Sequence, residues 1–308
     1  MDGRGRAMTT KGEKRLAYMA LALPAVIIYL AVVAFPTIFS VLLSLTDYNG
    51  GPIFGPGSNI QFAGLKSYLW MFTDPSGNFY TALKNNLLIV GVSVFGQIPL
   101  GFILAYILSR KLIKKGNSIF QTMIYLPNVI SSIIIGVLFN AIIYGRNSVL
   151  MDIRRIFDPA AVFTMSSNPM APVLVVILWM FTGFYMIIFL ANMQRIDPAI
   201  IEAARIDGAK ESGILWHITL PALSGVIITT AILAISGSLK SFDLIYAMTN
   251  GGPAGQTRVL SLYMYQSAFQ GAPNYPLANA ISTVMVVISI ILIIMTMSLG
   301  KAFREKEV

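Results

Sequence analysis

Six long apolar runs leave this 308-residue chain few possible folds. They lie near residues 17–45, 86–108, 119–144, 171–193, 222–245 and 277–299. A helix needs about 20 residues to cross the roughly 30 Å hydrocarbon core of a bilayer. In that core only helices and closed barrels satisfy all of their backbone hydrogen bonds. The runs therefore predict an all-α polytopic membrane protein with about six transmembrane helices.

The composition supports a membrane location and narrows the possible chemistry. Hydrophobic residues make up 56% of the chain and charged residues 11%, against roughly 25% charged in soluble domains. The chain has no cysteine, and its one histidine, His217, leaves little for a metal site or a histidine base. The sequence contains no G-x-x-x-x-G-K-[ST] loop, the pattern that binds nucleotide phosphates. We expect no catalytic residue, no metal site and no cofactor on this chain.

Prolines predict irregularities in two of the runs. The first run is overlong and contains Pro24 and Pro36, so we expect a kink or an interfacial start. It is also too long for a signal peptide and lacks a small-residue cleavage site, so we expect it to be retained. In the third run, Asn128 beside Pro127 indicates a bend. The chain divides into an N-terminal segment (1–16), a transmembrane domain (17–299) and a tail (300–308).

The basic residues predict the orientation. With a cytoplasmic N-terminus, 15 of the 22 Lys and Arg residues fall in cytoplasmic segments, although the loops on the other side are longer. Cytoplasmic loops are enriched in Lys and Arg. This bias explains the formal net charge of +9 without a nucleic-acid partner. Both termini, and the loop between the fourth and fifth runs, are predicted to be cytoplasmic.

That loop, residues 194–221, is a polar segment between two apolar runs. Its charges cannot lie in hydrocarbon, so the segment must face water. We expect two short helices, the second over residues 209–217, with Pro221 starting the next span. Glu202 and Asp207 offer charges to bases at the rim of a partner protein. The alternative is an ordinary amphipathic connector.

The first of these helices carries clear local signals. Asp197 is a good N-cap, and Pro198 suits the first helical position, where a missing N–H costs nothing. Gly208 fits the left-handed turn that closes a helix. Ala203 and Ala204 are small, so a helix that carries them can approach a groove closely on another protein.

The same segment matches a known pattern. Glu202-Ala203-Ala204-Arg205-Ile206-Asp207-Gly208 is followed after nine residues by Ile218-Thr219-Leu220-Pro221. This arrangement, E-A-A-x-x-x-G-x9-I-x-L-P, resembles the EAA motif in the cytoplasmic loop of permease subunits of ATP-binding-cassette (ABC) importers.

Further motifs resemble the carbohydrate-uptake branch of type I ABC importers. Phe62-Ala63-Gly64-Leu65-Lys66-Ser67-Tyr68 is similar to F-x-G-L-x-N-Y, with Ser67 in place of the usual Asn. Phe242-Asp243-Leu244-Ile245-Tyr246 and Thr249-Asn250-Gly251-Gly252-Pro253 resemble the maltose-system F type and the glycerol-phosphate permeases. The resemblance covers nearly the whole chain, which lacks the extra N-terminal helices and large external domain of the enteric maltose relative.

The resemblance implies a fold, partners and a location. The fold would be that of a type I ABC importer permease in a bacterial or archaeal cytoplasmic (inner) membrane. The partners would be a second, homologous permease in a heterodimer, a dimer of cytoplasmic ATPases and an extracytoplasmic solute-binding protein. The substrate would be a sugar or oligosaccharide. ATP and Mg²⁺ would be bound by the ATPase subunits.

The resemblance also implies site residues. The contact with the ATPase would be formed by Glu202, Ala203, Ala204, Asp207 and Gly208. The loop that carries them would be held in place by Ile218, Leu220 and Pro221. The sugar path would include aromatic side chains of the fourth run and small or polar residues of the fifth: Trp179, Phe184, Tyr185, Gly237, Ser238 and Ser241. The alternative is structural, because serines often serve helix packing and aromatic side chains often face lipid or the core.

Lys240 has two interpretations. Three residues from Asp243 on one helix, it can be neutralised by that carboxylate or reach towards the membrane interface. Alternatively, it attracts an anionic substrate and belongs to the substrate path.

Two other classes of function remain open at this point. A secondary solute carrier also has membrane helices with polar residues, but it needs no charged docking segment, and six spans are few for a monomeric carrier. A channel subunit is a third possibility, although no part of the sequence resembles a selectivity filter.

Overall fold

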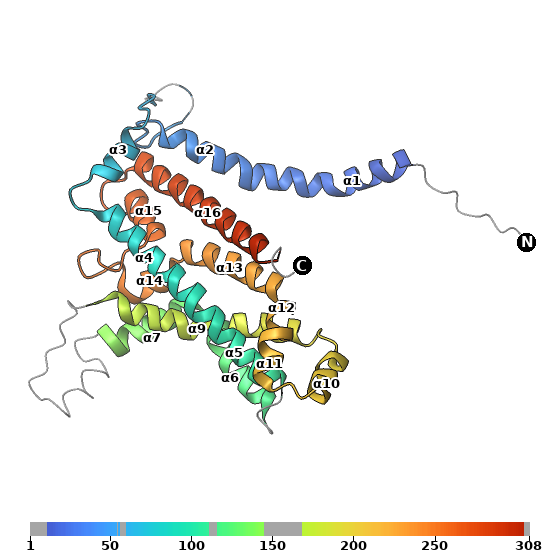
Figure 1. Cartoon of the computed structure of the whole chain (residues 1–308). Coiled ribbons are helices and arrows are strands. Elements are labelled where there is room, and N and C mark those ends of the chain that lie inside the picture. The colour runs from blue at the N-terminus through green and yellow to red at the C-terminus, as the bar shows by residue number, and fades with distance from the viewer. Residues whose placement is uncertain (1–10, 54, 56–59, 111–115, 145–167, 305–308) are drawn as a thin grey trace, which may run out of the picture.

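The computed structural model describes residues 11–53, 55, 60–110, 116–144 and 168–304 (Figure 1). Within these ranges every regular element is a helix, apart from one isolated bridge between Thr46 and Phe62. Four helices are long and apolar enough to cross a membrane, and two bent helix pairs bring the number to six if each pair is one span. The predicted all-α fold is confirmed.

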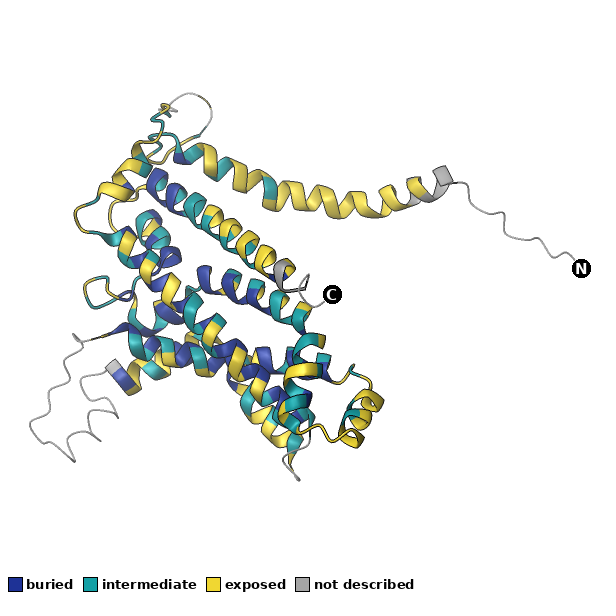
Figure 2. Ribbon diagram, viewed as in Figure 1, coloured by how far each residue is buried: buried dark blue, intermediate teal, exposed yellow. Residues whose placement is uncertain are grey.

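The N-terminal helix extends away from the rest of the molecule (Figure 1). It consists of α1 (Lys11–Tyr29), the π-helical turn η1 (Leu30–Ala34) and α2 (Phe35–Ser44). Its described side chains are mostly exposed up to the end of α2, which packs beside the last helix (Figure 2). The expected irregularity lies at η1, whereas Pro24 is accommodated inside α1.

Three π-helical turns each end two residues before a proline. A proline has no N–H to donate, and its ring displaces the carbonyl four residues earlier, so the preceding turn widens. The three turns are η1, η2 (Ser93–Gln97) and η4 (Leu215–Thr219), which precede Pro36, Pro99 and Pro221.

The second span and α9 (Met170–Met193) form the most extensive helix contact in the described part of the chain. The second span joins α4 (Asn78–Val92), η2 and α5 (Ile98–Ser109). A Cβ atom at Gly101 would lie 2.9 Å from the backbone nitrogen of Met186, so only glycine permits this approach. The buried side chains around this contact form one of the apolar cores.

The third predicted span is broken. α6 (Asn117–Val129) and α7 (Ser132–Phe139) meet at 88°, and a π-helical turn, η3 (Asn140–Tyr144), follows α7. Pro127 lies in the last turn of α6, so the bend expected there is confirmed, but the run does not form one straight helix.

The fifth predicted span, near 222–245, begins close to the expected residue but ends earlier than expected. α13 begins at Ser224 and ends at Leu239, and α14 (Asp243–Thr249) follows a short break. Side chains from other helices bond the carbonyl groups at this break. Asn86 Nδ2 lies 2.9 Å from the Ser238 carbonyl oxygen, and the Ser261 hydroxyl donates to the Ser241 carbonyl. These tertiary contacts satisfy groups that a longer helix would have bonded internally.

The remaining helices give the molecule two distinct ends. α3 (Lys66–Thr73), α15 (Leu260–Phe269) and the start of α16 (Tyr275–Arg304) gather at one end (Figure 1). The ends of α5 and α16 and the start of α13 lie towards the other end, which also carries the polar segment.

Candidate functional site

The polar segment begins with a capped helix, α10 (Pro198–Ile206). The Asp197 carboxylate accepts a hydrogen bond of 2.9 Å from the backbone N–H of Ala199, which satisfies one of the unpaired donors at the helix start. Gly208 has φ +86°, the left-handed conformation that ends the helix. The sequence prediction for this helix is confirmed.

α10 has no buried residue (Figure 2). Glu202, Ala203 and Asp207 are exposed and Ala204 is half-buried. Ile206 is 86% exposed. No atom of the described chain lies within 4 Å of the position of a Cβ atom on Gly208. Within the part of the chain that the structure describes, the face of α10 that carries the motif is therefore uncovered.

The second half of the segment turns back into the body. The helix expected over 209–217 is present as a continuous helical stretch from 211 to 222, made of α11 (Glu211–Ile214), η4 and α12 (Leu220–Ala222). Ile214 is buried, and Leu220 packs against the apolar core around α5 and α9. Together with the half-buried Ile218 and Pro221, Leu220 holds this half against the membrane helices.

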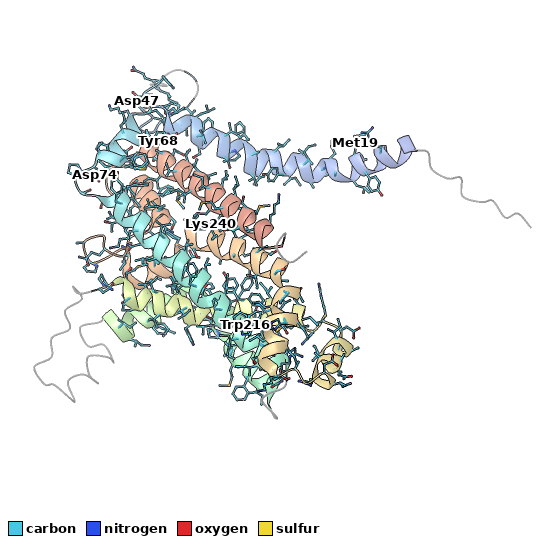
Figure 3. All side chains as sticks on the ribbon, in the orientation of Figure 1. Met19, Asp47, Tyr68, Asp74, Trp216 and Lys240 are labelled. Carbon is cyan, nitrogen blue, oxygen red and sulfur yellow. The ribbon has the colours of Figure 1, made fainter. Side chains whose placement is uncertain are left out.

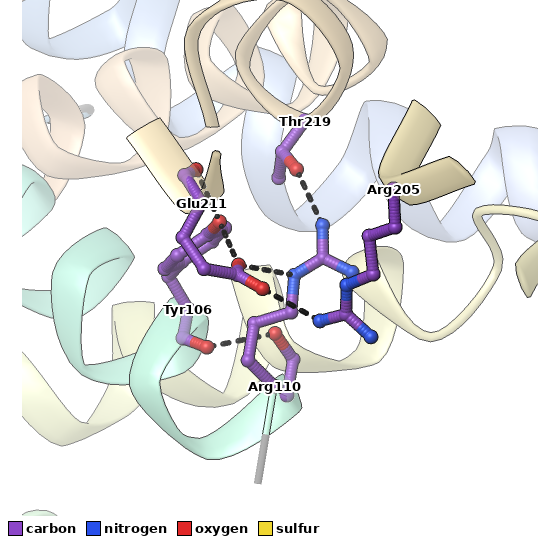
Figure 4. Close-up of polar contacts among 6 residues, drawn as sticks. Tyr106, Arg110, Arg205, Glu211 and Thr219 are labelled. Carbon is purple, nitrogen blue, oxygen red and sulfur yellow. Dashed lines mark hydrogen bonds and ion pairs between the residues drawn. The ribbon is translucent and has the colours of Figure 1, made fainter. Parts of the chain in front are cut away.

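A polar cluster, missed from the sequence, ties the segment to the end of α5 (Figure 4). The Tyr106 hydroxyl lies 2.9 Å from Glu211 Oε2 and 3.0 Å from the Glu211 carbonyl oxygen. Arg205 Nη2 lies 2.6 Å from Glu211 Oε1. Arg110 Nη2 donates to Thr219 Oγ1 at 3.2 Å, and its Nε is 3.8 Å from Glu211 Oε2. We call these five residues the polar clamp.

The polar clamp is partly shielded from water. Tyr106 is 8% exposed and the Arg110 side chain 9%, and the Arg110 guanidinium lies over the Tyr106 ring at 5.2 Å. Burial opposes ionisation of Glu211, but hydrogen bonds from Arg205 and Tyr106 and the charges of both arginines outweigh it and lower the pKa of this carboxyl. Glu211 is thus an anion at neutral pH.

A hollow of about 300 Å³ separates α10 from the body. Its walls come from the ends of α5 and α9, from α10 and from η4, and include Arg110, Ile201, Glu202, Arg205 and Thr219. α10 is therefore held beside the membrane helices rather than packed against them.

A second cavity, of about 180 Å³, lies between η2, α9 and the break after α13. It brings together five residues predicted for the substrate path: Tyr185, Gly237, Ser238, Lys240 and Ser241. We call this space the inner cavity.

The inner cavity also has polar lining residues outside the predicted substrate path, two of them on η2. Ser93 and Gln97 lie in η2, where Gln97 Nε2 donates to the Ile177 carbonyl at 2.7 Å. Ser238 Oγ donates to Ser93 Oγ at 3.0 Å. A serine and a glutamine within an apolar run were the available signal, since buried polar side chains there need a partner or a cavity.

The three aromatic candidates separate in the structure. Tyr185 lines the inner cavity and is 6% exposed. Trp179 is 49% exposed and contacts the Phe139 ring, with centroids 5.6 Å apart. Phe184 lies edge-to-face with Tyr185, with ring centroids 5.3 Å apart. Trp179 and Phe184 are absent from the lining of the inner cavity as the structure describes it.

Lys240 and Asp243 do not share a helix. Lys240 follows the last residue of α13, and Asp243 is the first residue of α14. Both line the inner cavity, and among the described side chains they form no ion pair within 4.0 Å. The prediction of mutual neutralisation along one helix is wrong because α13 ends before Lys240. Figure 3 labels Lys240 next to α13, and this residue is exposed.

Comparison with known proteins identifies the class. Residues 97–306 match the family model described as the binding-protein-dependent transport system inner membrane component. The chain belongs to this family. It is the permease subunit of an ABC transport system, and the match includes the polar segment and most of the inner cavity.

Relatives of this permease extend over nearly its whole length. The probable ABC transporter permease YurN of Bacillus subtilis (strain 168) is 32% identical over 299 residues, 96% of this chain and 99% of that protein. The lactose transport system permease LacF of Rhizobium radiobacter is 32% identical over 274 residues, 87% of this chain and 89% of that protein.

The fold of the permease also has solved counterparts. A chain of a bacterial alginate ABC transporter, crystallised with an alginate pentasaccharide-bound periplasmic protein, superposes with a TM-score of 0.78. The two chains are 23% identical over 96% of this permease and 97% of that chain. The resemblance to an ABC importer permease fold, predicted from the motifs, is confirmed.

Proposed function

We propose that the permease is one half of the translocation path of an ATP-driven saccharide importer, and that α10 docks on a cytoplasmic ATPase. The exposed, capped α10 carries this proposal, because its motif residues Glu202, Ala203 and Asp207 have no cover from the described chain. Gly208 ends the docking helix, Ala204 allows close approach, and Ile218, Leu220 and Pro221 seat the segment on the body.

The inner cavity supports a saccharide as the substrate. Its polar groups include hydroxyls such as that of Tyr185, the amide of Gln97, the ammonium group of Lys240 and the carboxylate of Asp243, while Ile89 and Phe181 supply apolar walls. This mixture suits a sugar ring, which has apolar faces and a hydroxylated rim. The lactose permease of Rhizobium radiobacter is a relative with a named sugar substrate.

The proposal assigns the remaining tasks to partner chains. A second, homologous permease completes the path, an extracytoplasmic binding protein delivers the sugar, and a pair of ATPases binds ATP and Mg²⁺. This permease then catalyses no reaction and binds no cofactor. The absence of a G-x-x-x-x-G-K-[ST] sequence supports this division.

We also propose an orientation for the permease in the membrane. The permease lies in the cytoplasmic membrane with both termini and α10 on the cytoplasmic side. The distribution of 15 of 22 basic residues supports it, as does the position of α10 at the same end of the molecule as the end of α16.

Reconstitution tests the proposed function. The permease pair, with its ATPases and binding protein, would be placed in proteoliposomes with a panel of radiolabelled neutral and acidic saccharides. We expect uptake only with both ATP and the binding protein. Uptake driven by an ion gradient without ATP would identify a secondary carrier and contradict the proposal.

A further inference from the structure

The docking helix α10 makes few contacts with the membrane helices, so few contacts are available to transmit its movement to them. Within the described part of the chain, α10 packs against no other helix over more than a few residues, and the hollow of about 300 Å³ lies beside it (Figure 1). A lever that must move membrane helices needs a firm attachment to them. The backbone at the two ends of α10 provides one attachment to the body, and side-chain contacts provide a second.

The polar clamp is the side-chain attachment. Arg205, on the last turn of α10, is joined to Glu211 by an ion pair of 2.6 Å. Glu211 is in turn joined to Tyr106, near the end of α5, at 2.9 Å. The Arg205 and Glu211 side chains are 51% and 41% exposed, so water weakens their ion pair, whereas the Tyr106 end of the chain is buried. A continuous bonded chain thus runs from α10 to the second span.

We propose that the polar clamp couples α10 to the second span, with Tyr106 and Glu211 as the positioning residues that carry the movement. This inference rests on the proposed docking of α10 on an ATPase. It assigns the route into the membrane to α5, in addition to the direct chain connection through α12 and α13.

The course of the second span explains why this route matters. α5 continues through η2 into α4 as one helix, and Ser93 and Gln97 of η2 line the inner cavity. α5 also packs along α9, which carries Tyr185 on another wall of that cavity. A displacement of the end of α5 therefore reaches two walls of the inner cavity through one rigid helix and its close-packed neighbour.

Arg110 adds a second connection in the polar clamp, between the end of α5 and η4. It extends beyond the end of α5, bonds Thr219 of η4 and covers the Tyr106 ring. Thr219 is 2% exposed and is the last residue of η4, which leads through α12 into α13. The clamp consequently holds α5 and η4 together while Glu211 remains reachable from α10.

Two isosteric variants test the clamp in the complete transporter. Tyr106→Phe removes the hydroxyl and keeps the ring under Arg110, and Glu211→Gln removes the charge and keeps the side-chain length. In proteoliposomes containing both permeases, the ATPases and the binding protein, we expect each variant to reduce sugar uptake per ATP hydrolysed at least about five-fold. Copurification of the ATPases should be unchanged, because the docking face of α10 is untouched.

Tyr125→Phe is the matched control. Tyr125 lies on α6, is half-buried, and its hydroxyl has no hydrogen-bond partner among the described residues. This variant should keep the wild-type ratio of uptake to hydrolysis.

The double variant separates a coupling unit from two independent defects. If Tyr106 and Glu211 act as one unit, the double variant is no worse than the more impaired single variant. Wild-type ratios in both single variants, or losses that multiply in the double variant, would overturn the clamp. A wild-type transporter that takes up sugar without ATP would instead overturn the proposed function, so the two failures are distinguishable.

Discussion

Gly208 is constrained by its backbone rather than by its surroundings. Its φ is +86°, while the space around a Cβ atom at this position is open. A side chain in this conformation costs about 1–2 kcal/mol for an L-residue. We predict that Gly208→Val leaves the permease in the membrane but alters the end of α10, so that ATP hydrolysis continues while uptake falls at least about ten-fold. Uptake and hydrolysis in proteoliposomes measure both.

The control for this variant is Gly225→Val. Gly225 lies in α13, also with open space around it, but its φ is not positive. We expect near-normal uptake. Normal transport by Gly208→Val would count against a requirement for the left-handed turn.

Removing the hydroxyl group of Tyr185 tests whether the inner cavity binds the sugar. The ring is buried in the core, and the residue lines the cavity. Tyr185→Phe keeps the ring packing and removes one hydrogen-bonding group, worth about 0.5–1.5 kcal/mol. We expect the substrate concentration for half-maximal uptake to rise about three- to ten-fold, with unchanged ATPase assembly. An unchanged concentration dependence would place the sugar elsewhere.

At the level of elements, helix ends that depend on nearby residues could be predicted from the sequence, whereas helix ends that depend on tertiary contacts could not. Asp197, Pro198 and Gly208 define α10 by backbone bonding within a few residues, so the prediction succeeded. The end of α13 at Leu239 depends on Asn86, more than 150 residues away along the chain. No pattern within the fifth apolar run contains that information.

The same distinction applies to the two candidate sites. Tyr185 and Ser238 were predicted by resemblance, and the fold does bring them to one cavity. Ser93, Gln97 and the polar clamp join segments that only the fold places together, although Arg205 and Glu211 could have been paired across the turn at Gly208.

Helix contacts that depend on glycine give a prediction for stability. A Cβ atom at Gly183 would lie 2.3 Å from the Ile124 carbonyl oxygen on α6, so α6 and α9 would have to separate. We expect Gly183→Ala to destabilise the permease by about 1–3 kcal/mol, as overpacking does. Thermal unfolding in detergent would show a lower Tm.

Gly91→Ala is the control, because no described atom outside the adjoining backbone of α4 lies within 4 Å of its Cβ position. This variant should keep or slightly raise the Tm, since alanine favours a helix over glycine. Equal Tm values for the Gly183 and Gly91 variants would contradict the close contact of α6 with α9.

For the whole molecule, the two ends in Figure 1 should face opposite sides of the membrane. The chain has no native cysteine, so single cysteines report without background. We predict that an impermeant thiol reagent applied from outside labels Ala272→Cys, between α15 and α16, but not Ser212→Cys in α11. Inverted vesicles stripped of peripheral subunits should give the opposite result. Labelling of Ser212→Cys from outside would contradict the topology.

The docking of α10 on an ATPase is the central claim for the assembled transporter, and copurification of the ATPases with Ala203→Trp tests it most directly. Ala203 is exposed on α10, where a tryptophan leaves this chain's own packing intact but blocks close approach by a partner. We predict that the permease pair remains associated while the ATPases are lost, and that Ala272→Trp, at the opposite end, retains them. Full retention of the ATPases by Ala203→Trp would contradict the account.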